Sequence, residues 1–173
     1  MKKSLVDHLG QYATYHRDPR NIATHFIGIP LIVVAVAVLL SRPQWAAGWL
    51  SPAVLVSLAS AWFYLRLELR LGLLMTVLLG LCIWAGHVLA QQSTLVWLAS
   101  GIGLFVVGWA IQFVGHHYEG RKPAFVDDVT GLIVGPLFVV AELAFLLGLR
   151  RELKEQIEAR AGGVRVNPKR AAA

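Results

Sequence analysis

Long apolar runs constrain the fold of this chain more than any other feature of its sequence. The runs cover residues 25–40, 52–65, 71–90, 95–114 and 129–149. Their apolar residues are contiguous, whereas a helix on the surface of a soluble domain spaces them three or four positions apart. Only 15% of the residues are charged, while soluble domains carry about 25%. The sequence therefore predicts an all-α integral membrane protein.

The first four runs are predicted to cross the bilayer as a helical bundle, in a single membrane-embedded domain of residues 1–160. The first of these helices extends from Pro19 to about Leu40. Residues 4–16 are typical of an amphipathic helix that lies in the membrane interface. The end of the chain, residues 161–173, is expected to be disordered.

The positions of the cations predict the topology, because cytoplasmic segments of membrane proteins are rich in lysine and arginine. Basic residues lie before the first run, in the links at 66–70 and 121–122, and after residue 149. Four spans with the N-terminus inside place all of these segments in the cytoplasm. A fifth span would carry the basic tail outside, so we expect a broken or re-entrant segment that pivots near Gly135-Pro136. The second run, which is short for a bilayer, is the alternative segment that does not span.

The composition excludes several function classes. The formal charge is +6, but the cations lie in links and termini and form no continuous face for nucleic acid. The single cysteine, Cys82, excludes an intrachain disulfide. The sequence has no glycine-rich phosphate loop, GxSxG motif or HExxH motif.

Potential metal ligands follow the fourth apolar run. Gln112, His116 and Glu119 are spaced i, i+4 and i+7, so they share one face of a helix. In the predicted topology the first span starts at the membrane surface at which the fourth span ends. His16 and His25 therefore lie at the same depth in the membrane as His116. Several imidazoles beside a carboxylate suit a transition metal such as non-haem iron, although ligand type alone does not separate iron from zinc.

Four other residues have both a site role and a structural alternative. His117 follows His116 but points about 100° away from it, toward the lipid headgroups. His87 lies in the third run, near the opposite membrane face. Asp128 is either a ligand or a helix N-cap, and Glu142 is either a site residue or the partner of a structural arginine.

Two blocks of the sequence carry a more specific pattern. Residues 16–30 follow His-x4-Asn-x3-His-x4-Pro, and residues 109–124 follow Trp-x2-Gln-Phe-x-Gly-His-x2-Glu-x3-Pro-Ala. With these blocks the chain resembles the membrane-bound 2-hydroxy fatty acid dioxygenase family, over nearly its whole length up to about Leu149. The second block is most similar to bacterial members, so a bacterial inner membrane is expected, or the endoplasmic reticulum if the chain is eukaryotic.

The resemblance implies an Fe(II)-dependent enzyme that uses molecular oxygen to convert a 2-hydroxy fatty acid to a fatty acid one carbon shorter, at the cytoplasmic membrane surface. By motif position, His16, His25 and His116 are the expected iron ligands. The polar motif residues are expected to orient the imidazoles: Asn21, Gln112, Glu119 and Asp128. Nearby cations are expected to attract the substrate carboxylate: Arg17, Arg20, Arg121 and Lys122.

Two other functions stay open from the sequence. A membrane protein that binds or transports metal would use the same histidines without oxygenase chemistry. Transport would need polar groups along a path through the bilayer, for which His87 is the one indication. A non-catalytic lipid-binding protein would place its histidines in the interface and bind no metal. The partners of the oxygenase would be the bilayer, the 2-hydroxy fatty acid and oxygen, without nucleic acid.

Overall fold

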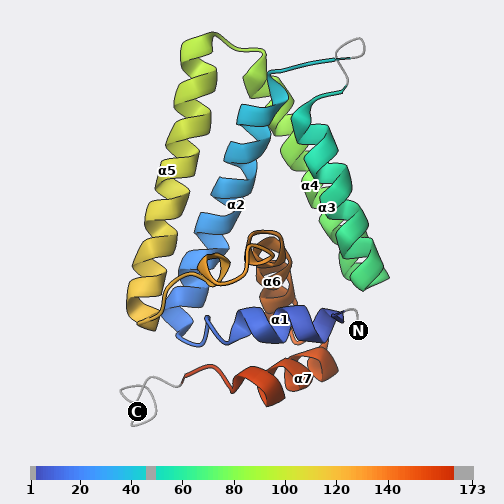
Figure 1. The fold of residues 1–173 in the computed structure, drawn as a ribbon, viewed down its shortest axis with the longest axis vertical. Helices are drawn as coiled ribbons and strands as arrows, with labels where there is room; N and C mark the ends of the chain where they lie inside the picture. The colour runs from blue at the N-terminus through green and yellow to red at the C-terminus, as the bar shows by residue number, and fades with distance from the viewer. Residues whose placement is uncertain (1–2, 46–49, 166–173) are drawn as a thin grey trace. The chain divides into compact units, whose positions relative to one another are not determined.

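The structure is a computed structural model that describes residues 3–45 and 50–165. Within these ranges it has seven α-helices, one short 3-10 helix and no strand (Figure 1). The helices are α1 (Leu5–Ala13), α2 (Pro19–Ser41), α3 (Pro52–Leu67), α4 (Leu69–Ala90), α5 (Thr94–Glu119), the 3-10 helix η2 (Ala124–Val126), α6 (Gly131–Leu146) and α7 (Arg151–Ala161). The prediction of an all-helical fold is confirmed.

The chain divides into two units, and each is described by itself. The site unit comprises Met1–Phe26 and Gln112–Ala173, and the apolar unit comprises Ile27–Ile111. Helices α2 and α5 begin in one unit and end in the other. A single domain over residues 1–160 stays a prediction.

Glycines set the close helix contacts of the apolar unit. Helices α3 and α4 pack side by side as a hairpin (Figure 1). A Cβ added to Gly72 would lie 2.6 Å from the Cα of Leu65, and one added to Gly86 would lie 2.8 Å from the carbonyl oxygen of Ala37 in α2. Any larger side chain would push the helices apart, so these small residues allow the backbones to approach closely.

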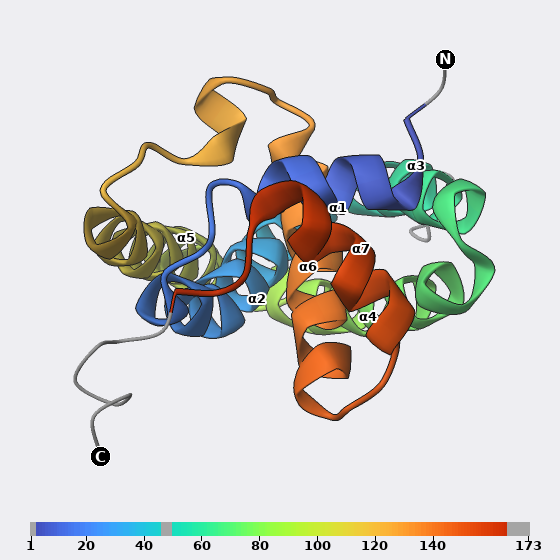
Figure 2. The same ribbon diagram turned by 90° about the horizontal axis from the view of Figure 1, so that it is seen from below.

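In the site unit, α1 packs against α6 and α7 (Figures 1 and 2). Ser4 and Asp7 form a capping box at the start of α1, and Asp7 also pairs with Arg160 of α7. The predicted apolar face is buried, and Leu9 is fully inaccessible. The helix ends at Ala13, three residues before the predicted end, so the next residues form a turn that leads into α2.

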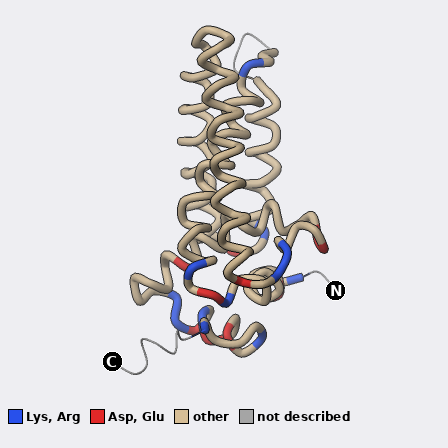
Figure 3. Tube along the Cα trace, turned by 90° about the vertical axis from the view of Figure 1, so that its left-hand side faces the viewer, with Lys and Arg blue, Asp and Glu red and all other residues tan. Residues whose placement is uncertain are grey.

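Among the described residues, three helices are long and apolar enough to cross a membrane: α2, α4 and α5. A fourth span requires that α6 and α7, which are bent by 118°, count as one. Helix α3 has 16 residues, fewer than the roughly 20 that a bilayer needs. The charged residues of the long helices lie near the helix ends (Figure 3). The helices therefore support a membrane protein, but they do not confirm four spans.

The fifth apolar run breaks at a different place from the predicted one. A pivot at Gly135-Pro136 is wrong, because α6 continues through both residues. Proline is tolerated inside membrane helices. The chain turns after Leu146, where Gly148 (φ 73°) and Arg150 (φ 57°) adopt left-handed conformations. A left-handed glycine ends a helix readily because it has no Cβ.

Candidate metal centre

Three histidines from separate parts of the sequence meet inside the site unit. His16 lies in the turn before α2, His25 near the start of α2 and His116 near the end of α5. Their exposed fractions are 0%, 2% and 6%. One potential ligand nitrogen from each ring lies within 4.8 Å of the other two. This histidine triad is the set that the sequence singled out as iron ligands.

Backbone carbonyls orient two rings of the triad. Nδ1 of His16 lies 2.8 Å from the carbonyl oxygen of Tyr12, and Nδ1 of His25 lies 2.8 Å from that of Asn21. A carbonyl oxygen only accepts, so Nδ1 is the donor in each ring and Nε2 keeps a free lone pair. This is the tautomer in which Nε2 can bind a metal.

The two free Nε2 atoms, of His16 and His25, face each other at 2.9 Å. Two lone pairs at this distance repel each other unless a cation or a proton is shared. A shared proton would create an imidazolium, but burial, followed by the electrostatic effect of the neighbouring His25, lowers the pKa of His16 well below its usual value. If His16 and His25 held one metal ion through these two Nε2 atoms, attraction to the cation would replace the repulsion. The spacing therefore fits a transition metal.

The third ring, that of His116, lies edge-on to the other two, with centroids 5.0 Å from His16 and 5.2 Å from His25. Its Nδ1 is buried without a hydrogen-bond partner in the described part of the chain. Such an orphaned nitrogen is unfavourable inside a protein, and a metal or its ligand would satisfy it. The residues present therefore fit a bound metal, and imidazole suits iron, zinc, copper or nickel.

Glu119 holds the turn that precedes α2. Its Oε2 accepts hydrogen bonds from the backbone N–H of Arg17 at 3.0 Å, the backbone N–H of Asp18 at 2.8 Å and Nδ2 of Asn21 at 3.0 Å. Its Oε1 lies 3.3 Å from the guanidinium of Arg165. The carboxylate thus fixes the backbone beside the triad, and it hydrogen-bonds no imidazole among the described residues.

Asn21 and Gln112 each precede a triad histidine by one helical turn. Nδ2 of Asn21 donates to the carbonyl oxygen of Tyr15 and to Glu119, while its Oδ1 is buried without a partner in the described ranges. Gln112 is 3% exposed, and both its amide atoms likewise have no described partner. The expected orienting contacts to the imidazoles therefore come from backbone carbonyls.

Asp128 and Glu142 have structural contacts outside the triad. Oδ1 of Asp128 accepts hydrogen bonds from the backbone N–H and the hydroxyl of Thr130, just before α6, at 3.0 and 2.7 Å. Oε1 of Glu142 lies 3.9 Å from Nη2 of Arg17. The contact of Glu142 is the arginine pair that was the alternative to a site role, whereas Asp128 is not the helix N-cap, because Thr130 holds that position in α6 without a side-chain cap hydrogen bond.

Two further histidines are not members of the triad. His117 is exposed, with its ring edge-on to that of Tyr118. His87 belongs to the apolar unit, where its Nε2 lies 2.7 Å from Nε2 of Gln91. The cluster of metal-competent groups found among the described residues contains neither of them.

The four cations expected near a substrate carboxylate all contact protein groups. Three of them are paired as follows: Arg20 with Asp18, Lys122 with Asp127, and Arg121 with the carbonyl oxygen of Thr14. Arg17 is buried, and its Nη1 donates to the carbonyl oxygen of Gly162 at 2.7 Å. Its Nη2 has no hydrogen bond within the described ranges, but it lies 3.9 Å from Oε1 of Glu142, so this guanidinium is also ion-paired.

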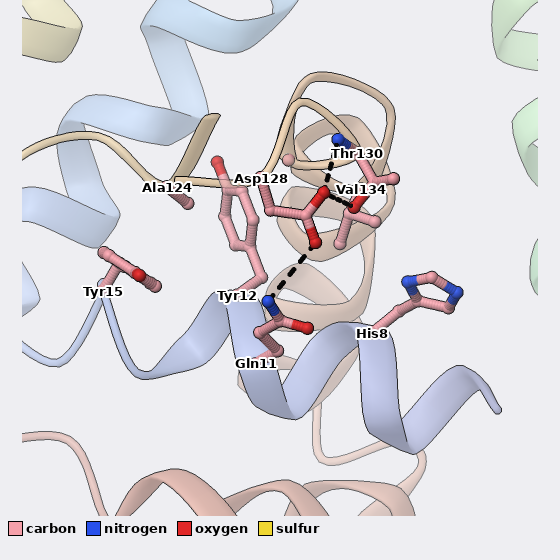
Figure 4. Close-up of a pocket in the computed structure, with 9 residues that line it drawn as sticks. His8, Gln11, Tyr12, Tyr15, Ala124, Asp128, Thr130 and Val134 are labelled. Carbon is pink, nitrogen blue, oxygen red and sulfur yellow. Dashed lines mark hydrogen bonds between the residues drawn. The ribbon is translucent and has the colours of Figure 1, made fainter. Parts of the chain in front are cut away.

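Two neighbours of the site were not identified from the sequence. The ring of Tyr12 stacks on His16, with centroids 4.2 Å apart and planes inclined by 7°; their i, i+4 spacing was the available signal. Tyr12 also lines a small pocket together with Gln11 and Asp128 (Figure 4). The second is Arg165, which follows α7 in the chain and pairs with Glu119. No local sequence pattern marks it as a site residue.

Comparisons with known proteins agree with the motif resemblance. Residues 2–95 and 73–147 match the family described as 2-hydroxy-palmitic acid dioxygenase Mpo1-like. The chain is similar to the 2-hydroxy-palmitic acid dioxygenase MPO1 of Saccharomyces cerevisiae, with 37% identity over 163 residues that cover 91% of each chain. No solved structure matches the chain. The triad lies within the matched residues, whereas Arg165 lies beyond the family match.

Proposed function

The chain belongs to the 2-hydroxy-palmitic acid dioxygenase Mpo1-like family and is an enzyme of the dioxygenase class, and we propose that it oxidises a 2-hydroxy fatty acid at iron(II) held by the triad. The product would be a fatty acid one carbon shorter. The observation that carries the proposal is the set of three buried imidazoles, two of which have Nδ1 bound to a carbonyl and Nε2 free.

The proposed iron ligands are His16, His25 and His116. Iron(II) supplies the redox chemistry with molecular oxygen that amino-acid side chains do not provide. Glu119 and Asn21 hold the turn that carries His16, and the burial of the triad excludes bulk water from the reacting groups. Asp128 would support the site from a distance, by fixing the turn before α6.

Arg17 is the proposed partner of the substrate carboxylate. It is buried next to His16 in the chain, and its Nη2 has no hydrogen bond among the described residues although it lies 3.9 Å from Oε1 of Glu142, so the substrate carboxylate would bind there beside Glu142 or in its place. Arg20, Arg121 and Lys122 would instead give this surface a positive potential that attracts anionic lipids. The acyl chain of the substrate would lie along the apolar helices.

The proposed location is an integral membrane position with the triad at the cytoplasmic surface. The basic segments of the sequence support this orientation. The second motif block favoured a bacterial inner membrane, but the relative that the chain matches is a yeast protein and gives that preference no support. One membrane-embedded domain over residues 1–160 is part of the same proposal.

The direct test of this function is turnover by the purified full chain. Detergent-solubilised protein, loaded anaerobically with Fe(II), should consume oxygen when 2-hydroxypalmitic acid is added and should release the fatty acid with one carbon fewer. Palmitic acid is the control substrate, and His25→Ala is the control variant. Failure of the iron-loaded wild type to form the shortened acid would overturn the proposal.

A further inference from the structure

Gln112 is a buried amide with an available donor and an available acceptor. Its side chain is 3% exposed, and neither Oε1 nor Nε2 has a hydrogen-bond partner among the described residues. Most buried polar side-chain atoms in proteins are paired, because an unpaired buried amide is unfavourable. A packing role alone would be served better by leucine or methionine, so the amide points to recognition of a ligand.

The position of Gln112 places this amide beside the proposed reaction site. It lies one helical turn from His116 on the same face of α5. A Cβ added to Gly115 would meet Oγ1 of Thr24 and would lie 2.6 Å from Oδ1 of Asn21. Helix α5 therefore approaches the first turns of α2 closely at Gly115. Gln112, one turn earlier in α5, lies in the interior of the site unit.

Along α5, His116 lies between Glu119 and Gln112, one helical turn from Gln112. Glu119 accepts from the backbone N–H of Arg17, so Arg17 and Gln112 lie toward opposite sides of His116 along this helix. A substrate with its carboxylate toward Arg17 would direct its second carbon and its acyl chain toward Gln112. The amide would then face the 2-hydroxyl and not the carboxylate.

We propose that Gln112 is a specificity-determining residue that recognises the 2-hydroxyl group of the substrate. Its Oε1 accepts the hydroxyl hydrogen, and its Nε2 can donate to the hydroxyl oxygen. A fatty acid without the hydroxyl leaves the amide unpaired, and buried polar groups discriminate between ligands in this way. The inference rests on the proposed function and adds the residue that selects hydroxylated over plain fatty acids.

The test is equilibrium binding to the full chain, loaded with Fe(II) and kept anaerobic so that no turnover occurs. 2-Hydroxypalmitic acid and palmitic acid compete with a fluorescent fatty acid, and iron content is measured for each sample. Gln112→Leu and Gln112→Met remove the amide with little change of volume. Gln92→Leu is the matched control, because Gln92 is an exposed glutamine outside the site unit.

The wild type and Gln92→Leu should bind the hydroxy acid at least about tenfold more tightly than palmitic acid. Both Gln112 variants should keep iron and palmitic acid binding but lose about tenfold in this preference. An unchanged preference in the iron-loaded variants would overturn the inference, and so would loss of iron in both, because the amide would then be structural. A wild type that fails to turn over the hydroxy acid would instead refute the proposed function itself.

Discussion

Nε2 of His16 and Nε2 of His25 lie 2.9 Å apart in the interior of the site unit. In both rings Nδ1 donates to a backbone carbonyl oxygen, so the lone pairs of the two Nε2 atoms face each other across this distance. A bound cation would turn the repulsive contact into an attractive one, which makes metal binding and folding interdependent.

Metal should therefore stabilise the folded protein. At a free Fe(II) concentration of about 100 times Kd, the gain is about 2.7 kcal/mol, which raises Tm by roughly 5–10 °C for a chain of this size. Anaerobic thermal unfolding in detergent with and without Fe(II) measures the shift. His25→Ala should show almost none, and an equal shift in that variant would mean that the metal binds elsewhere.

The metal-free protein should lose stability in mild acid. Burial, followed by the electrostatic effect of the neighbouring His25, lowers the pKa of His16 well below its usual value, so below about pH 6.5 the unfolded chain binds a proton that the folded protein does not. The free energy of unfolding then falls as pH falls, by up to about 1.4 kcal/mol per pH unit from this group. Tm between pH 7.5 and 5.5 should fall less in His16→Asn than in the wild type.

The control for this pH series is His117→Asn, because His117 is an exposed histidine of the same unit. That variant should keep the pH dependence of the wild type. If His16→Asn keeps it as well, the buried neutral imidazole is not the source of the acid sensitivity.

Glu119→Gln should weaken metal binding without removing a ligand. Oε2 accepts three N–H bonds that fix the turn carrying His16, and a neutral amide is a weaker acceptor that adds a competing donor. Residues that support metal ligands typically contribute 10- to 100-fold to affinity, and a loss in this range is expected in anaerobic Fe(II) titration. Glu155→Gln, an exposed change on α7, should have no effect; equal affinity in both variants would refute the supporting role.

The segment after α7 should contribute to the same turn. The backbone N–H of Arg165 donates to the carbonyl oxygen of Arg17 at 2.8 Å, and the carbonyl oxygen of Gly162 accepts from Arg17. Arg165→Gln removes only a partly exposed ion pair to Glu119, so Fe(II) affinity should change by less than about fivefold. Truncation after Ala161 removes the backbone contacts too and should lower affinity and Tm further.

The control for the truncation is a chain that ends at Arg165, because it keeps every one of these contacts. It should match the wild type in Fe(II) affinity and in Tm. If the chain that ends at Ala161 behaves identically to this control, the segment after α7 does not support the site.

The sequence was sufficient to predict the elements that depend on local chemistry. Contiguous apolar residues predicted the long helices, and the spacing of His25 and His116 from the other polar motif residues predicted which helix faces carry the site. The start of the first long helix at Pro19 is as predicted. These features follow from helical periodicity and composition, which are properties of short stretches.

The features that the sequence could not supply depend on contacts between distant residues. Glu119 bonds the backbone N–H of Arg17 and Asp18, about a hundred positions away, and no local pattern distinguishes it from a carboxylate that faces an imidazole. The predicted pivot at Gly135-Pro136 was wrong because proline in a membrane helix need not break it, whereas the left-handed Gly148 ends the helix.

The most direct measurement of the central claim is the iron content of purified protein after anaerobic Fe(II) loading. The wild type should hold about one iron per chain, and His16→Ala, His25→Ala and His116→Ala should each lose it, because each removes one ligand of a single site. His117→Ala should keep the wild-type content. A wild type without stoichiometric iron, or a His25→Ala variant that retains it, would contradict the account.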